Sequence, residues 1–158
     1  MFEALTIAGW GDMDFNAHMR NTAYLDKAVD VRMQFFAANQ FPISEFTRLR
    51  IGPVVMRDDV EYFREVHLME PLRVVLKLVG MSEDGSRFQV RNEFFRGDWQ
   101  LAARITSTGG WFDLTQRKLI APPDNLLRTF RKLGEGYEVR VLPSSIKESA
   151  VGNTMDVT

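Results

Sequence analysis

The chain of 158 residues contains no cysteine. This absence excludes disulfide bonds, thiolate catalysis and any zinc site built on cysteine ligands. Histidine is scarce, since His18 and His67 are the only two, and no cluster of carboxylates accompanies them. Glycine loops of the dinucleotide-binding and P-loop types are missing too. We therefore expect neither a metal nor another bound cofactor.

Long hydrophobic runs and an excess of one charge are also missing. The formal net charge is −1 and no basic run stands out, which argues against electrostatic binding of nucleic acid. No apolar run approaches the length of a membrane span, and residues 1–6 do not resemble the start of a signal peptide. We expect a cytoplasmic protein that binds neither nucleic acid nor membranes.

Hydrophobic residues make up 45% of the chain and charged residues 26%, proportions that are ordinary for a globular protein. The chain is long enough to bury one hydrophobic core. We expect a single domain over residues 1–143. Residues 144–158 are polar and weakly patterned, which predicts a flexible C-terminal tail.

The spacing of hydrophobic residues along the chain predicts a strand and a long helix, followed by consecutive strands. The expected strands are 2–10, 52–66, 72–81, 86–96, 100–114 and 137–142, and the expected helices are 22–38 and 125–133. Asp84-Gly85 and Gly97-Asp98 suit tight hairpins between strands. Gly109-Gly110 inside a strand indicates a bulge or a close backbone approach.

The long helix shows one apolar stripe, formed by Leu25, Val29, Met33 and Phe36. Asp26, Lys27 and Asp30 fall on the other side, where we expect a solvated face. Asn21 is a plausible N-cap. This order of elements predicts an α+β fold, in which a curved antiparallel sheet wraps around one long central helix. One helix covers only one face of such a sheet, so an edge strand should pair with a second copy.

The densest polar cluster lies between the first strand and the helix. It contains Asp12, Asp14, Asn16, His18 and Asn21. Thioester hydrolysis needs a base or nucleophile beside the carbonyl carbon and donors aimed at the oxygen, where negative charge develops. A loop carboxylate can supply the first, and the free amides of the helix N-terminus can supply the second.

Each residue of the cluster also has a structural interpretation. Asp12 and Asp14 are common turn residues whose side chains bond to their own backbone. His18 can be a hydrogen-bonded structural histidine, and Tyr24 can pack its ring against the sheet. His67 is expected in a strand, as a surface residue.

The pattern Asp12-x-Asp14-x-x-x-His18-x-x-Asn21-x-x-Tyr24-Leu25 resembles the 4-hydroxybenzoyl-CoA thioesterase-like branch of the hotdog superfamily. The resemblance continues in three later segments, residues 60–75, 100–108 and 111–123, and covers roughly residues 2–127. It implies a hotdog fold and an acyl-CoA thioesterase that works as a homodimer or a dimer of dimers. The partner chain would supply part of the acyl pocket.

The resemblance also assigns roles to residues. Asp14 would be the catalytic carboxylate, acting as a general base on water or as a nucleophile. His18 is the second catalytic candidate, although some members of the family place their histidine where this chain has Asn21. The backbone amide near Asn21 would polarise the thioester carbonyl, and Asn21 and Tyr24 are the expected substrate-binding residues.

Two alternatives stay open. Asp14-Phe-Asn-Ala-His18 resembles the Asp-x-Asn-Pro-x-His motif of hotdog enoyl-CoA hydratases and dehydratases, but it lacks the proline and is one residue shorter. A non-catalytic acyl-CoA binder is the other alternative. The sequence specifies neither the acyl group nor the contacts to the CoA phosphates, for which Arg57, Arg64, Arg87 and Arg91 are equal candidates.

Overall fold

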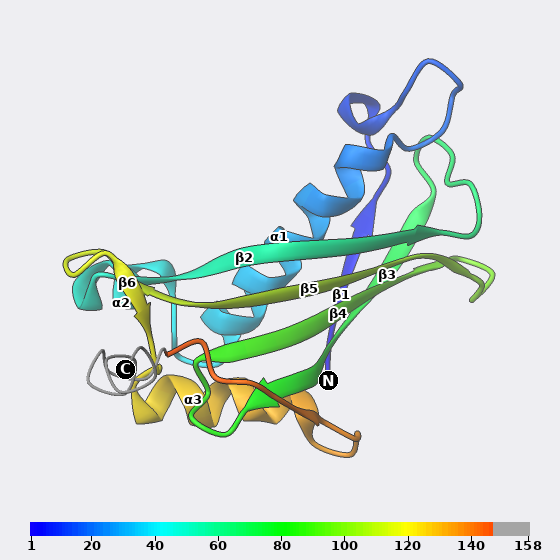
Figure 1. Cartoon of the computed structure of the whole chain (residues 1–158). Coiled ribbons are helices and arrows are strands. Elements are labelled where there is room, and N and C mark those ends of the chain that lie inside the picture. The colour runs from blue at the N-terminus through cyan, green and yellow to red at the C-terminus, as the bar shows by residue number, and fades with distance from the viewer. Residues whose placement is uncertain (147–158) are drawn as a thin grey trace, which may run out of the picture.

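The computed structural model describes residues 1–146 (Figure 1). A flexible tail is expected over residues 144–158. Residues 147–158 of this segment lie outside the described residues. The strands are β1 (Phe2–Ile7), β2 (Ile51–Tyr62), β3 (Pro71–Ser82), β4 (Arg87–Arg96), β5 (Leu101–Asp113), β6 (Lys118–Ile120) and β7 (Arg140–Leu142). The helices are α1 (Asn21–Ala38), α2 (Ile43–Leu49) and α3 (Asp124–Arg131), with short 3-10 turns at Trp10–Asp12 and Lys132–Gly134.

The sheet follows the order β1-β3-β4-β5-β2, and all neighbours along this path are antiparallel. β6 adds to β5, and β7 runs parallel to the end of β3. The predicted antiparallel sheet is thus confirmed. The expectation of one long helix is met in part, because α2 and α3 accompany the 18-residue α1. α2 is not among the predicted helices; it begins directly after Pro42 and is only seven residues long.

The buried face of α1 coincides only in part with the predicted stripe, since Phe36 is buried and Leu25 and Met33 are partly buried against the core. Its buried residues are Ala23, Tyr24, Ala28, Val31, Phe35 and Phe36. Val29, at the centre of the predicted stripe, is 47% exposed. The two fully buried alanines have short side chains, which lets the helix backbone approach the sheet closely. The larger residues Val29 and Met33 are therefore displaced to the flank of the helix.

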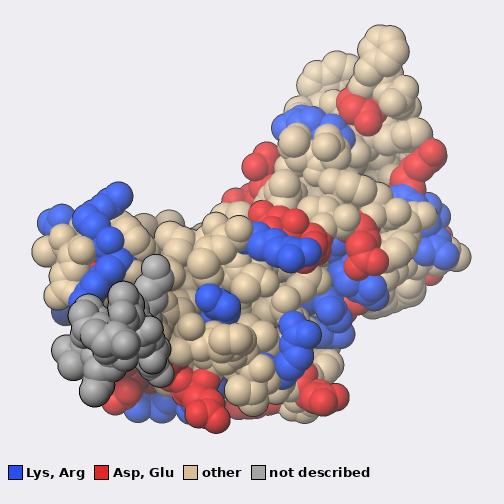
Figure 2. All heavy atoms as spheres, in the orientation of Figure 1, with Lys and Arg blue, Asp and Glu red and all other residues tan. Residues whose placement is uncertain are grey.

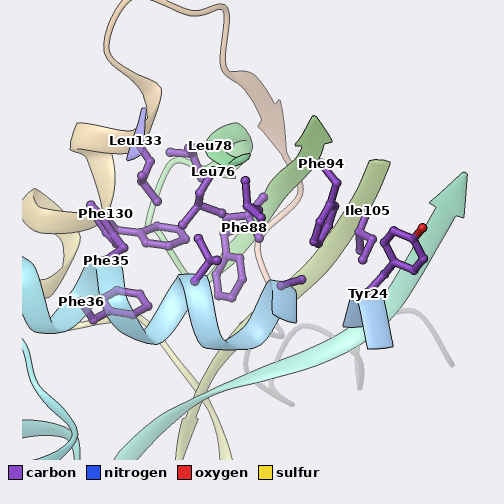
Figure 3. Packing of buried hydrophobic residues seen from close by; sticks show 14 of the residues in the cluster. Tyr24, Phe35, Phe36, Leu76, Leu78, Phe88, Phe94, Ile105, Phe130 and Leu133 are labelled. Atoms are coloured by element: carbon purple, nitrogen blue, oxygen red, sulfur yellow. The ribbon is translucent and has the colours of Figure 1, made fainter. Parts of the chain in front are cut away.

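The core between α1, α3 and the sheet is largely aromatic at one end (Figure 3). Phe36, Phe88, Phe130 and the fully buried Trp111 pack there with ring centroids 4.9–6.0 Å apart. Such pairs add to the stabilisation that comes from burying their area. Tyr24 lies at the opposite end of the same layer, which is the end nearest the start of α1.

The glycine predictions are confirmed. The β3–β4 hairpin turns at Gly85, whose φ of +75° favours glycine. The register of β2 against β5 shifts between Val55 and Arg57, opposite Gly109. A Cβ at Gly109 would overlap the backbone oxygen of Val54. The two strands therefore approach each other at this bulge as only glycine allows.

Two smaller predictions are wrong. Asn21 is the first residue of α1 rather than its cap, because the chain enters helical geometry one residue earlier, after Arg20. His67 lies in the connection between β2 and β3, outside any strand, because β2 ends at Tyr62. Ser144 and Ser145 are hydrogen-bonded to the β3–β4 turn through Asp84 and Ser86. No helix within residues 1–146 is both long and apolar enough to cross a membrane.

Candidate active site

The connection from β1 to α1, residues 8–20, projects beyond the end of the sheet (Figure 1). Asp12 fastens this connection to the helix. Its Oδ2 accepts a hydrogen bond of 2.8 Å from the Gly9 amide and lies 2.9 Å from Nζ of Lys27. Lys27 is largely buried, so it does not belong to the solvated face that the sequence predicted. Burial raises the pKa of Asp12, but the bonds from Lys27 and Gly9 outweigh it and hold that pKa below its ordinary value. Asp12 is therefore an ionised structural anchor.

Asp14 forms a turn and still keeps one oxygen available. Its Oδ1 accepts hydrogen bonds from the backbone amides of Asn16 (2.8 Å) and His18 (3.1 Å). The turn closes through Ala17, which has a φ of +63°. No donor within the described residues bonds to Oδ2 of Asp14. The turn interpretation and the catalytic interpretation are therefore compatible, because each uses a different oxygen.

Asp14 borders a cleft of about 330 Å³. The lining residues are Asp14, His18, Met19, Asn21, Tyr24, Tyr62, Phe63, Arg64 and Glu65. All four predicted site residues are therefore brought together. The amides of Asn21 and Thr22, in the first turn of α1, have no acceptor among the described residues. The cleft thus combines a carboxylate with the positive end of an 18-residue helix dipole.

The side chain of His18 pairs with a carboxylate outside the Asp14 loop. Its Nε2 lies 3.1 Å from Oε2 of Glu65. Its ring also packs edge-on against His67, with centroids 5.5 Å apart. Of the groups of His18, only its backbone amide bonds to the Asp14 carboxylate within residues 1–146. His18 and Asp14 therefore share a cleft without sharing a side-chain hydrogen bond.

Tyr24 forms the floor of the cleft. Its ring packs edge-on against Tyr62 and Phe94, with centroids 5.5 and 5.4 Å apart. Burial, followed by the fields of Tyr62, Glu70 and Asp14, raises the pKa of Tyr24 to about 12. Its hydroxyl therefore stays protonated at physiological pH. Tyr62 in turn donates a 3.2 Å hydrogen bond to the backbone oxygen of Asn21.

Sequence reasoning missed the far wall of the cleft, which consists of Tyr62, Phe63 and Glu65. Tyr62 is the last residue of β2 and the other two lie just after it, and no local pattern links them to the Asp14 loop. Arg64 belongs to the same segment and donates to the backbone oxygen of Leu101 at 2.8 Å. Of the four arginines considered for CoA phosphates, Arg64 is the one that lines the cleft.

The charges on the face drawn in Figure 2 are mixed, with Lys and Arg interspersed among Asp and Glu. Within the described part of the chain, no group of three or more His, Asp or Glu residues is arranged to hold a metal ion.

The model of the thioesterase-like superfamily matches residues 8–130. This chain belongs to that superfamily. The match spans the Asp14 loop, α1 and the sheet, so the resemblance read from the sequence is confirmed. The predicted class of enzyme, a thioester hydrolase, is confirmed at the level of the family. Among curated proteins, none matches the sequence significantly.

Solved structures share the fold at low sequence identity. A hypothetical protein of Staphylococcus aureus, characterised in complex with CoA, has a TM-score of 0.79 and 16% identity, covering 94% of this chain and 92% of that one. A 1,4-dihydroxy-2-naphthoyl-CoA thioesterase from Synechocystis has a TM-score of 0.75 and 16% identity, covering 84% and 96%. A probable thioesterase from Escherichia coli has a TM-score of 0.72 and 18% identity, covering 85% and 100%. These likenesses show the hotdog fold.

Proposed function

We propose that this protein is an acyl-CoA thioesterase that hydrolyses its substrate to a free acid and CoA, with Asp14 as the catalytic carboxylate. One observation carries the proposal. Oδ1 of Asp14 accepts hydrogen bonds from two backbone amides, while Oδ2 has no donor within residues 1–146. The same cleft contains the start of α1, where the amides of Asn21 and Thr22 have no acceptor in that part of the chain. The carboxylate acts on water as a general base or attacks the thioester carbon directly. The similar structures that bind CoA or cleave CoA thioesters support the substrate class.

The start of α1 suits the other half of the chemistry. As the carbonyl carbon is attacked, its oxygen gains negative charge. Amides already aimed at that position stabilise the charge at little reorganisation cost. We assign this role to the amides at Asn21 and Thr22. The side chain of Asn21 is exposed and makes no hydrogen bond within residues 1–146, so it is free to bind substrate. Tyr24 would hold the acyl group as a neutral phenol.

His18 has a positioning role in this proposal. Its imidazole is engaged by Glu65, and its backbone amide is one of the two that orient Asp14. A hydratase would need the Asp14 and His18 side chains to act on one water, and the pairing with Glu65 favours hydrolysis instead. At the rim of the cleft, Arg64 is our candidate for contact with a CoA phosphate.

We further propose a homodimer or a dimer of dimers. β2 is an edge strand of 12 residues, and its outer side has no partner strand among the described residues. Val55, Met56 and Tyr62 are large exposed side chains along it. Long edge strands of this kind are usually covered by another strand. The partner chain would then complete the acyl pocket. The cytoplasm remains the proposed compartment, since a cysteine-free chain is compatible with its reducing conditions.

The test is Asp14→Asn, assayed by release of CoA thiol from a panel of short, long and aromatic acyl-CoAs. Asparagine retains the Oδ1 acceptor that holds the turn but cannot act as a base. We expect turnover to fall by about 10²–10⁴-fold while acyl-CoA binding and thermal stability are retained. Asp26→Asn, at an exposed position on α1, is the matched control and should keep full activity.

Turnover at the wild-type level in Asp14→Asn would show that Asp14 is only a turn residue. Crotonyl-CoA hydration, measured in parallel, separates the alternatives. Hydration without release of thiol would replace the thioesterase proposal with the hydratase. Binding of acyl-CoA with neither reaction would indicate a non-catalytic binder.

A further inference from the structure

A second hollow lies at the other end of α1, and it shares no lining residue with the Asp14 cleft. It has a volume of about 110 Å³. The lining residues are Val29, Arg32, Met33, Phe36, Pro53, Val55, Leu76, Phe88, Val90, Phe130 and Leu133. Figure 3 shows several of them, including Phe36, Phe88 and Phe130, gathered at the end of the core away from Tyr24. Arg32 is the only polar residue in this lining.

Arg32 is half-buried, and its bonding partners are all uncharged. Its Nε donates to Oδ1 of Asn92 at 3.0 Å, and its Nη2 donates to Oγ of Ser107 at 2.7 Å. Both partners are fully buried. Nη1 has no acceptor among the described residues. Arg32 therefore lines the apolar cavity with two guanidinium nitrogens bonded and with Nη1 unbonded among the described residues.

The nearest carboxylate does not neutralise Arg32 directly. Asp58 on β2 is exposed and accepts a hydrogen bond from Ser107, while no described carboxylate lies within 4.0 Å of the Arg32 guanidinium. Burial lowers the pKa of Arg32 and the field of Asp58 raises it. Arginine nevertheless keeps its charge in proteins. A partly desolvated cation without a direct counter-ion is costly, and an anion that reached Nη1 would reduce that cost.

We propose that this cavity binds an apolar chain that ends in a carboxylate, with Arg32 as its anion-binding residue. The hydrocarbon part occupies the space between α1, β2 and the phenylalanine side chains, and the carboxylate bonds to Nη1 of Arg32. This chemistry has two possible sources. One is a free carboxylic acid, which needs no assumption about catalysis. The other is the distal carboxylate of an acyl-CoA, a case that rests on the proposed thioesterase function.

The free-acid source is tested by calorimetric titration of the purified full-length protein with octanoate, and with octanol as the uncharged analogue. Wild type should bind octanoate at least about tenfold more tightly than octanol, since a hydrogen bond to a charged group is involved. Arg32→Gln should remove that preference. Arg91→Gln is the matched control, because Arg91 also donates to a neutral hydroxyl, that of Thr106, but does not line this cavity.

The acyl-CoA source is tested by comparing suberoyl-CoA with octanoyl-CoA, which differ in the terminal carboxylate. Wild type should show a KM for suberoyl-CoA that is lower by about tenfold or more, and Arg32→Gln should abolish the difference. Hydrolysis of octanoyl-CoA by both proteins reports on the proposed function separately. If neither thioester is cleaved, the thioesterase proposal fails. The octanoate titration then still shows whether the cavity binds a carboxylate through Arg32.

Arg32→Gln also removes hydrogen bonds that join α1 to the sheet, so a second variant, Val29→Trp, tests the cavity with Arg32 in place. Val29→Trp fills the cavity from α1. It should weaken octanoate binding without changing the fold. The proposal is overturned if octanoate and octanol bind alike in wild type and suberoyl-CoA has no advantage over octanoyl-CoA. It is equally overturned if both variants keep the wild-type preference for octanoate over octanol and for suberoyl-CoA over octanoyl-CoA.

Discussion

Nε2 of His18 lies 3.1 Å from Oε2 of Glu65, and this pair joins the β1–α1 loop to the segment that follows β2. The loop carries Asp14, and the segment carries the far wall of the cleft. The pair therefore holds the two sides of the cleft together beside the 2.7 Å hydrogen bond that the Met19 amide donates to the backbone oxygen of Val66. It is partly exposed, so its own contribution to stability is small. Its importance lies in the geometry that it imposes on the loop.

We predict that His18→Gln lowers turnover by less than about tenfold, far less than Asp14→Asn. Glu65→Gln should have a similar effect, because either change breaks the same pair. The double variant should lose little more than each single one, since residues that act through one contact are not additive. Steady-state kinetics of the four proteins provides the measurement. A loss as large as that of Asp14→Asn would instead make His18 a catalytic residue.

Tyr24 should make the protein sensitive to alkali. Its folded pKa of about 12 lies above the unfolded value of 10.0. The folded state therefore binds more protons between these values, and its stability falls as pH rises from about 10 to about 12. Below pH 10 this contribution is fully present. Tyr24→Phe should flatten the fall, as seen in urea unfolding at a series of pH values. An unchanged slope would contradict the prediction.

Gly109→Ala should destabilise the protein by about 2–3 kcal/mol. The added Cβ meets the backbone oxygen of Val54, which cannot move without disturbing the pairing of β2 with β5. Gly52→Ala is the matched control in the same pair of strands, because nothing lies within 4 Å of the position of its Cβ. It should change stability by no more than about 0.5 kcal/mol. Chemical denaturation of both variants checks the difference, and equal effects would exclude a close approach at the bulge.

Met56→Lys should weaken self-association of the protein. A charged residue on an exposed edge strand opposes pairing with another strand, and Met56 is exposed at the bulge of β2. Ile43→Lys, at an exposed apolar position on α2, controls for the loss of a surface hydrophobic side chain. Sedimentation of wild type should give a dimer or a larger assembly. A wild-type monomer, or an assembly that Met56→Lys leaves intact, would contradict the proposed interface.

The buried face of α1 is a feature that the local sequence pattern does not predict fully. Leu25, Val29 and Met33 recur at helical spacing, and so do the buried residues Tyr24, Ala28, Val31 and Phe35. Hydrophobicity favours the first set. Close packing against the sheet selects the second, because alanine lets the backbone approach. The choice depends on what the helix faces, and a local sequence pattern does not contain that information.

The sequence by itself determined the order of the five long strands with α1 and α3, the hairpins and the glycine bulge, because residue period and turn chemistry act over a few neighbours. It also placed Asp14, His18, Asn21 and Tyr24 together, since all four belong to one loop and the helix turn that follows. Only the tertiary structure decided that His18 pairs with Glu65 and that Arg32 borders an apolar cavity. Those relationships join distant segments, and the packing of α1 and β2 on the sheet brings them into contact.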